Sequence, residues 1–342
     1  MRNIRTTLMD WIFQTHGTIN HYKKDLHLGT QPVRVIHHML TYMFQNTHPD
    51  FFKDLMKQIE EGKLHNELNL VFEEEPIIIG NGLLRTPKIN NDTRKIELHE
   101  TFLSFLWCCT CSVFVTYIET IDYPRVNKEN GKITHPISQS NIDKARELFN
   151  YAKYLIVDFQ HWDKESLPNP EIYLAKNRNY VEQTNGYYTE AVKFILCHEF
   201  THLKYHVDQI DNQTTNSYFL AFEIEADNNA IDMMKRGMGK DKSPLTIAHN
   251  LAIENGIVFG LLSMFFFSAK TEGIKHPNTE DRLTNALERL DLIDNPFAWG
   301  IACVGLEMWD EQFGLKFNWS KIPVLYKDQY YDIINQIKQR TK

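Results

Sequence analysis

The sequence CHEFTH at residues 197–202 contains the pattern His-Glu-x-x-His, and the interpretation of the whole chain starts from it. On an α-helix His198 and His202 are one turn apart on the same face, so their imidazoles can bind one zinc ion together. Glu199 lies about 100° around the helix axis from His198, beside the place where a water molecule would sit. The pattern therefore predicts a helix that carries two zinc ligands and a general base for peptide hydrolysis.

A hydrolytic zinc site takes a third protein ligand and keeps a fourth position open. The sequence FEIEAD at residues 222–227 follows the first motif closely enough to supply that ligand. Glu223 and Asp227 are four residues apart, so on a helix they share one face. We expect Glu223 to bind the metal and Asp227 to accept a hydrogen bond from an imidazole N–H, that of His198, which would fix its tautomer.

Two other residues compete for the third ligand position. Glu225 lies about 200° around the helix from Glu223, and Asn229, four residues beyond it, orients a ligand less well than a carboxylate does. We therefore expect Glu225 on the solvated face. His206 continues the series 198, 202, 206, but on a straight helix it would lie about 12 Å from His198 along the axis, too far to share one ion. We expect His206 at the surface or at the rim of the site.

The sequence HPNTEDR at residues 276–282 is a third candidate element of the site. If His276 lies over the metal, it can donate a hydrogen bond to the oxyanion that forms when water attacks a peptide carbonyl. The same residues also fit an ordinary helix N-terminus with a polar cap and acidic first turn. His276 is thus a catalytic candidate, Arg282 a candidate for packing or substrate contact, and Tyr205 and Tyr218 stay open as alternative oxyanion donors.

The composition is ordinary for a soluble globular protein, with 42% hydrophobic and 24% charged residues in 342. The net charge of −7 comes without a basic tract, which argues against a nucleic-acid-binding protein. The five cysteines include no Cys-x-x-Cys pair, and three of them fall in one apolar segment, so we expect reduced thiols in a cytoplasmic protein. Residues 1–13 lack the apolar core and cleavage site of a signal peptide.

The apolar segment at residues 102–118 has 17 residues without a charge, at the lower limit for crossing a bilayer. It has no cluster of Lys or Arg near either end to orient it in a membrane. We interpret it as a buried core helix and expect no membrane association. The shorter apolar run at 257–269 is interpreted as the inner end of another core helix.

Hydrophobic periodicity predicts a predominantly helical α+β fold with a small β-sheet. Residues 1–66 are expected to be mostly helical, with a strand region at 68–97 that includes LNLVF, PIII and RKIEL. Further helices are expected at 98–120, 141–157, 188–206, 216–236, 245–270, 278–290, 297–312 and 328–340, with a polar loop at 122–138. The segment 169–175 is either a sheet edge that binds a peptide by strand addition or a plain connection.

These elements suggest three regions. Residues 1–97 form an N-terminal helical and strand region of unknown role, residues 98–295 form the metallopeptidase core, and residues 296–342 form a C-terminal helical segment packed on that core.

The pair HEFTH and EIEAD resembles the Glu-ligated, or gluzincin-type, zinc peptidases, whose second motif is Glu-x-x-x-Asp. HPNTEDR is similar to an element of the HtpX and CAAX-prenyl peptidase group, which is embedded in membranes through several spanning helices that this chain lacks. The size and the apolar helix with Trp107 before the zinc motif resemble the Lit-type phage-exclusion peptidases. The resemblance covers residues 198–282 and implies a zincin-like core with one zinc ion per chain.

The resulting hypothesis is a zinc-dependent endopeptidase that hydrolyses a cellular protein. The Lit-type resemblance implies a bacterial antiviral protease that acts on a translation factor, elongation factor Tu, during abortive infection. The alternatives are a regulatory or binding protein with a structural zinc ion and no proteolysis, or a chance motif in a helical interaction protein. A fourth protein ligand, such as His206 or His276, would favour the structural zinc ion.

Overall fold

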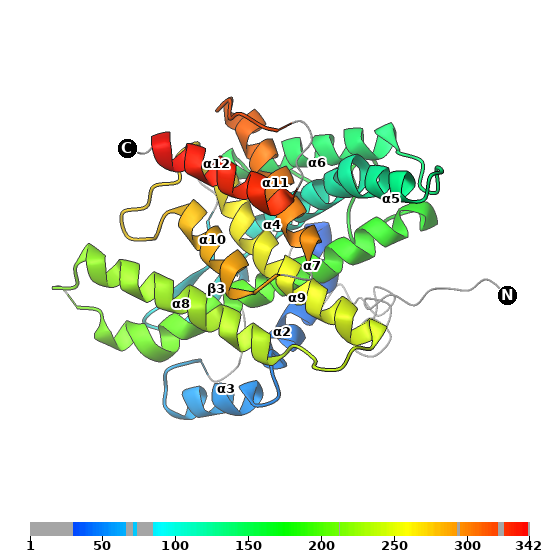
Figure 1. Cartoon of the computed structure of the whole chain (residues 1–342). Coiled ribbons are helices and arrows are strands. Elements are labelled where there is room, and N and C mark those ends of the chain that lie inside the picture. Colours follow the sequence, from blue (N-terminus) through cyan, green and yellow to red (C-terminus); the bar gives the residue numbers. More distant parts are fainter. Residues whose placement is uncertain are drawn as a thin grey trace.

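The computed structural model describes residues 30–65, 71–73, 85–211, 213–292, 295–320 and 325–340, which form a mostly helical α+β fold (Figure 1). The helices are α2 (His37–Gln45), α3 (Phe51–Glu60), α4 (Glu100–Tyr117), α5 (Tyr123–Glu129), α6 (Gln139–Val157), α7 (Arg178–Thr201), α8 (Asn216–Arg236), α9 (Pro244–Leu262), α10 (Thr279–Arg289), α11 (Pro296–Phe313) and α12 (Tyr326–Arg340). The small sheet has the order β1-β3-β2, with β1 (Val71–Glu73) parallel and β2 (Lys88–Asn90) antiparallel to β3 (Lys95–His99).

Helix α4 lies at the centre of the fold because it has no polar face to present to water. Every one of its residues except Thr116 is buried. It packs against α6, α7 and α11. The indole N–H of Trp107 donates a hydrogen bond of 2.7 Å to the side-chain oxygen of Asn185 on α7. This bond satisfies the one polar atom of a buried indole and ties the helix before the motif to the motif helix.

Two helical stretches, Glu100–Glu129 and Pro244–Phe267, are long and apolar enough to cross a membrane by length and composition alone. In this fold 89% and 72% of their most apolar windows are buried against other elements. Core helices of globular proteins pass the same test, so these stretches are weak evidence for a membrane span. The segment 102–118 is a core helix here, as its sequence predicted.

Helix α7 carries the His-Glu-x-x-His motif and packs against α9, α8, α4 and α2. Its backbone approaches α9 closely at Gly256, where an added Cβ would lie 2.3 Å from the Cβ of Glu190. The buried Glu190 carboxylate pairs with Lys193 one turn further along α7, at 2.5 Å. The motif therefore sits at the end of a helix that neighbouring elements hold on several sides.

The local predictions differ from the structure in three places. Helix α7 begins at Arg178, ten residues before the predicted start at 188, and the predicted loop 122–138 contains α5. Of the two alternatives for the segment 169–175, the structure has the plain connection, so only the sheet edge is wrong: the side-chain oxygen of Asn169 accepts hydrogen bonds from the N–H groups of Glu171 and Ile172 and closes a turn. The predictions for residues 1–29 and for PIII at 76–79 lie outside the described residues, and the division into three regions stays a prediction.

Candidate active site

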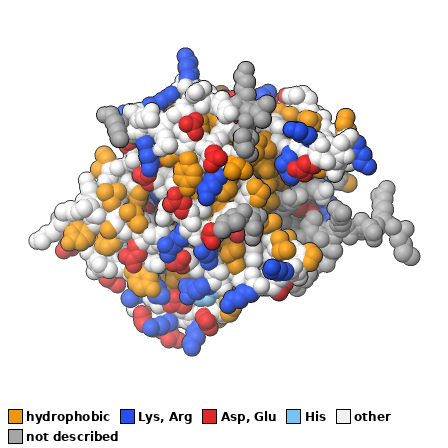
Figure 2. All heavy atoms as spheres, viewed as in Figure 1, with side chains coloured by type: hydrophobic (Ala, Val, Ile, Leu, Met, Phe, Trp, Pro, Cys, Tyr) orange, Lys and Arg blue, Asp and Glu red, His pale blue; other side chains and the backbone are white. Residues whose placement is uncertain are grey.

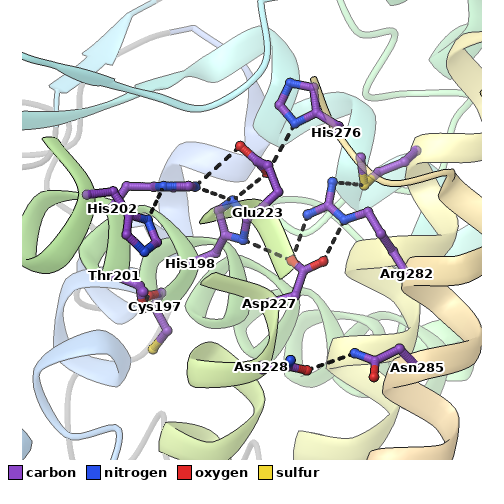
Figure 3. Close-up of polar contacts among 12 residues, drawn as sticks. Cys197, His198, Thr201, His202, Glu223, Asp227, Asn228, His276, Arg282 and Asn285 are labelled. Atoms are coloured by element: carbon purple, nitrogen blue, oxygen red, sulfur yellow. Dashed lines mark hydrogen bonds and ion pairs between the residues drawn. The ribbon is translucent and has the colours of Figure 1, made fainter. Parts of the chain in front are cut away.

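The two motif histidines and Glu223 converge where the C-terminal end of α7 meets α8 (Figure 3). The Nε2 atoms of His198 and His202 are 3.1 Å apart. The Glu223 carboxylate lies 3.4 Å from each of them, through Oε2 to His198 and through Oε1 to His202. One donor atom from each of the three residues lies within 4.8 Å of the others. The structure thus brings together the three residues that the sequence predicted as ligands.

These separations, two of which run to different oxygens of Glu223, are compatible with a tetrahedral zinc site. Zinc binds imidazole nitrogen and carboxylate oxygen at about 2.0–2.2 Å, which places two ligands of a tetrahedron about 3.3 Å apart. The two imidazoles and the carboxylate have the donor chemistry that zinc prefers in hydrolases. The residues present therefore fit a zinc ion, and they leave room for a fourth ligand that is not part of this group of three.

Asp227 fixes the ring of His198 from behind, as its spacing from Glu223 predicted. Its Oδ1 lies 2.9 Å from Nδ1 of His198, so this nitrogen carries the proton and Nε2 faces the other two donors. Arg282 from α10 binds the same carboxylate through Nε at 2.6 Å and Nη2 at 2.7 Å. Burial favours protonation of Asp227, but the Arg282 guanidinium and His198 hold its pKa at about 2.

The protonation of His198 follows from the same carboxylates. Burial alone lowers the pKa of an imidazole, but Asp227 and Glu223 together raise the pKa of His198 to about 10. In the metal-free protein this ring is therefore positively charged at neutral pH. A metal ion has to displace that proton, and the two carboxylates then compensate the charge of the ion instead.

Glu199 faces the same space as the three donors, with its carboxylate free. Within the described residues its side chain makes no hydrogen bond or ion pair, although it lines the cleft beside His198. Burial raises its pKa, and the nearby histidines oppose that shift. A carboxylate with a raised pKa beside a hydrolytic metal site has the properties of a general base. Its catalytic role stays a prediction.

His276 lies next to the three metal-donor residues and contacts one of them, Glu223. Its Nδ1 is 3.0 Å from Oε2 of Glu223, and 60% of its side chain is exposed. It precedes α10 and enters the site from the side opposite to α7 (Figure 3). This position keeps both predictions open, a hydrogen-bond donor over the reacting carbonyl and an ordinary residue at a helix N-terminus.

His206 is not at the surface, contrary to the prediction. It is 1% exposed, and its ring stacks on Phe222 with centroids 4.4 Å apart. Residues His202–His206 form a π-helical turn, and the prediction assumed a straight α-helix. His206 Nδ1 lies 2.8 Å from Nδ1 of His202, on the side of that ring away from the three donors, so it is not placed as a fourth ligand. Glu225 is 54% exposed at its side chain, as expected.

The site opens into a cleft of about 550 Å³. One wall comes from residues before, within and just after β2, and the other walls come mainly from α7, α8, α9 with the turn after it, the start of α4, and His276 and Arg282. Most of the lining is apolar and aromatic, and includes Phe102, Phe194, Ile195, Ile210, Phe219, Phe222, Leu261, Met264 and Phe267. Figure 2 shows positive and negative side chains interspersed over the visible face, without a continuous basic patch.

A comparison with protein-family models decides the family. Residues 96–302, more than half of the 342-residue chain, match the model of peptidase U49, and this range contains all of the candidate site residues. The chain belongs to the peptidase U49 family. Membership in U49 supports a protease, an enzyme that hydrolyses peptide bonds, with a protein or peptide as its substrate. Comparisons with curated proteins and with solved structures find no match.

Two features of this U49 site were missed from the sequence. Arg282 was assigned to packing or substrate contact, whereas it binds both oxygens of Asp227, including the Oδ1 that contacts His198. An arginine two residues after HPNTE was the only available signal, and it does not identify the residue that the arginine binds. His206 was removed from the site by the assumption of a regular helix, although its spacing from His202 was visible in the sequence.

Proposed function

We propose that this protein is a zinc-dependent endopeptidase with a zincin-like core, in which His198, His202 and Glu223 hold one zinc ion. The observation that supports the proposal most strongly is the separation of 3.1 Å between the two Nε2 atoms, with one Glu223 oxygen 3.4 Å from each of them. When bound, zinc would supply a Lewis acid that polarises water and the scissile carbonyl. The family supports the protease, and the donor set supports the metal.

Glu199 is proposed as the general base. Its carboxylate lines the cleft without a partner among the described residues, so it is available to take the proton of the attacking water. Burial raises its pKa and so makes it a stronger base, able to pass the same proton to the leaving amine. His276 is proposed to donate a hydrogen bond to the oxyanion from the opposite side.

We propose that the substrate binds along β2. This strand is at one end of the order β1-β3-β2, and within the described residues it pairs only with β3. Lys88 and Ile89 of β2, with Thr86 and Pro87 before them, line the cleft that holds the candidate site. An extended peptide can add to the free edge of such a strand through backbone hydrogen bonds. In this proposal β2 has the role that was one of the two alternatives for residues 169–175.

The apolar lining of the cleft suggests which residue lies beside the scissile bond. Phe194, Phe219 and Phe222 line the cleft together with His198 and Glu199. A large apolar side chain of the substrate would bury its surface there, at about 25 cal/mol for each Å² removed from water. We propose that cleavage occurs next to such a residue.

The biological role is proposed from the resemblance to the Lit-type peptidases. In this proposal the enzyme acts in the cytoplasm on one protein of the translation machinery, elongation factor Tu, as part of an antiviral response. The dedicated substrate distinguishes this role from general protein degradation.

The proposal is tested with purified, zinc-loaded protein in a bacterial lysate. We expect one cut protein with the wild type and none with Glu199→Gln, which should still bind one zinc ion. His202→Ala should lose both zinc and cleavage. Full turnover by Glu199→Gln would contradict the mechanism, and many cut proteins would contradict a dedicated substrate. Stoichiometric zinc without cleavage of any protein would favour a structural zinc site in a regulatory protein.

A further inference from the structure

The π-helical turn His202–His206 places a second histidine behind a proposed zinc ligand. The turn is closed by the N–H of Val207, which donates to the carbonyl of His202, five residues earlier. π-Turns inside helices are uncommon and occur often at functional sites. Here the turn brings the rings of His202 and His206 to a centroid distance of 4.9 Å, with their Nδ1 atoms 2.8 Å apart.

The positions of the nitrogens determine where the protons lie. His202 presents Nε2 to His198 and Glu223, so Nε2 must be unprotonated to bind a metal and the proton of the neutral ring is on Nδ1. That N–H donates to Nδ1 of His206, which must then be the acceptor. The proton of His206 is consequently on Nε2, which faces Oε2 of Glu225 at 3.5 Å.

The ring of His206 is held in this orientation by packing. It is 1% exposed and stacks on Phe222 with an interplanar angle of 13°. Its Nε2 has no hydrogen-bond partner among the described residues, so the polar contact that the ring makes is the one between its Nδ1 and Nδ1 of His202. A side chain buried only to fill space would not need a polar atom at Nδ1.

We propose that His206 orients His202, as Asp227 orients His198. His206 is then a positioning residue that fixes the tautomer of a ligand. The inference rests on the proposed zinc site. It adds to that site a neutral imidazole, that of His206, which accepts a hydrogen bond from the proposed ligand His202. Partners of this kind raise the affinity of a metal site by typically 10–100-fold.

The test measures zinc affinity by competition with a chromogenic chelator. We expect His206→Phe to weaken zinc binding about 10–100-fold, because it keeps an aromatic ring against Phe222 but removes the acceptor. His206→Asn should restore much of the affinity, since its side-chain oxygen can take the position of Nδ1. His48→Phe is the matched control, a buried histidine beside Phe51 and outside the site, and should bind zinc like the wild type.

Failure of this inference and failure of the proposed function give different results. A wild-type protein that binds no zinc contradicts the proposed function. Wild-type zinc binding with equal affinity in His206→Phe overturns the role of His206. If His206→Phe does not fold, nitrogen NMR of the zinc-loaded wild type tests the inference instead. We expect a proton on Nδ1 of His202 and on Nε2 of His206. The opposite tautomer of either ring overturns the inference.

Discussion

Arg282 binds the carboxylate of Asp227 through two nitrogens, at 2.6 and 2.7 Å, and both side chains are buried. The contact joins α10 to α8 across 55 residues of sequence, directly behind His198. A planar guanidinium that binds both oxygens of a carboxylate holds its orientation as well as its charge. The position of His198 therefore depends on how α10 packs against α8.

Arg282→Met should be strongly destabilising, because it leaves the Asp227 carboxylate buried without its cation. We expect a loss of about 3–5 kcal/mol in the free energy of unfolding, measured by urea denaturation of the metal-free protein. The double variant Arg282→Met, Asp227→Asn should recover part of that loss. Equal unfolding free energies of the wild type and Arg282→Met would show that the ion pair between Arg282 and Asp227 does not stabilise the fold.

Zinc affinity should depend steeply on pH. Since the pKa of His198 is about 10 in the metal-free protein, the ring is protonated below that pH and zinc must displace one proton. The apparent affinity should rise about tenfold for each pH unit between pH 6.5 and 8.5. Calorimetry in buffers of different ionisation enthalpy measures the proton release. Zinc binding to Asp227→Asn should release fewer protons than zinc binding to the wild type. A wild-type zinc affinity independent of pH would contradict a charged His198 ring in the metal-free protein.

Removal of the metal should abolish cleavage without unfolding the protein. Most of the core lies in helices away from the three donors, so the metal-free chain should keep its helical circular dichroism. Zinc at 100 times its dissociation constant should raise the unfolding free energy by about 2.7 kcal/mol through mass action. Thermal denaturation with and without zinc checks this, and cleavage that persists in excess chelator would rule out a metal mechanism.

Ile195→Gln tests the apolar cleft. Ile195 lines the cleft one turn before His198, so a polar amide there should lower kcat/KM about 10–100-fold for a substrate with a large apolar residue at the cut. Zinc affinity should not change. Ile247→Gln on the exposed face of α9 is the matched control and should keep full activity. An unchanged kcat/KM in Ile195→Gln would show that the cleft does not hold the substrate side chain.

Gly256→Ala tests the close approach of α9 and α7. An added Cβ would lie 2.3 Å from the Cβ of Glu190, so we expect a loss of about 1–3 kcal/mol in unfolding free energy. Gly260→Ala, one turn further on α9, is the control, because its nearest neighbour would be at 3.4 Å. There the gain in helix propensity should stabilise the protein by up to about 1 kcal/mol. Similar effects of the two changes in denaturation experiments would contradict the close approach.

Local sequence signals predicted well the part of the site that lies on α8. The bounds of α8 agree with the predicted range 216–236, because basic residues in the last turn and Gly237 mark its end. The spacing of Glu223 and Asp227 placed both carboxylates on the face that meets α7. These features depend on helix periodicity, which the sequence carries directly.

The predictions that were wrong or incomplete concern interactions that hydrophobic periodicity does not reveal. The first turns of α7 contain Asn185 and Gly186, which lower helix propensity, but the hydrogen bond from Trp107 requires Asn185 on a helix beside α4. The π-turn after His202 changes the geometry on which the exclusion of His206 rested. The partner of Arg282 depends on the packing of two helices that are distant in the sequence.

The burial of α4 on all sides has a consequence for the synthesis of the chain. α4 leaves the ribosome before residues 118–177, which precede its partner α7, and long before α11. At about 5–20 residues per second, translation of that interval takes several seconds, during which only α6 emerges of the three helices α6, α7 and α11 that cover α4. Nascent chains of this protein should therefore engage a chaperone that binds apolar segments, and the engagement should end once α7 has emerged.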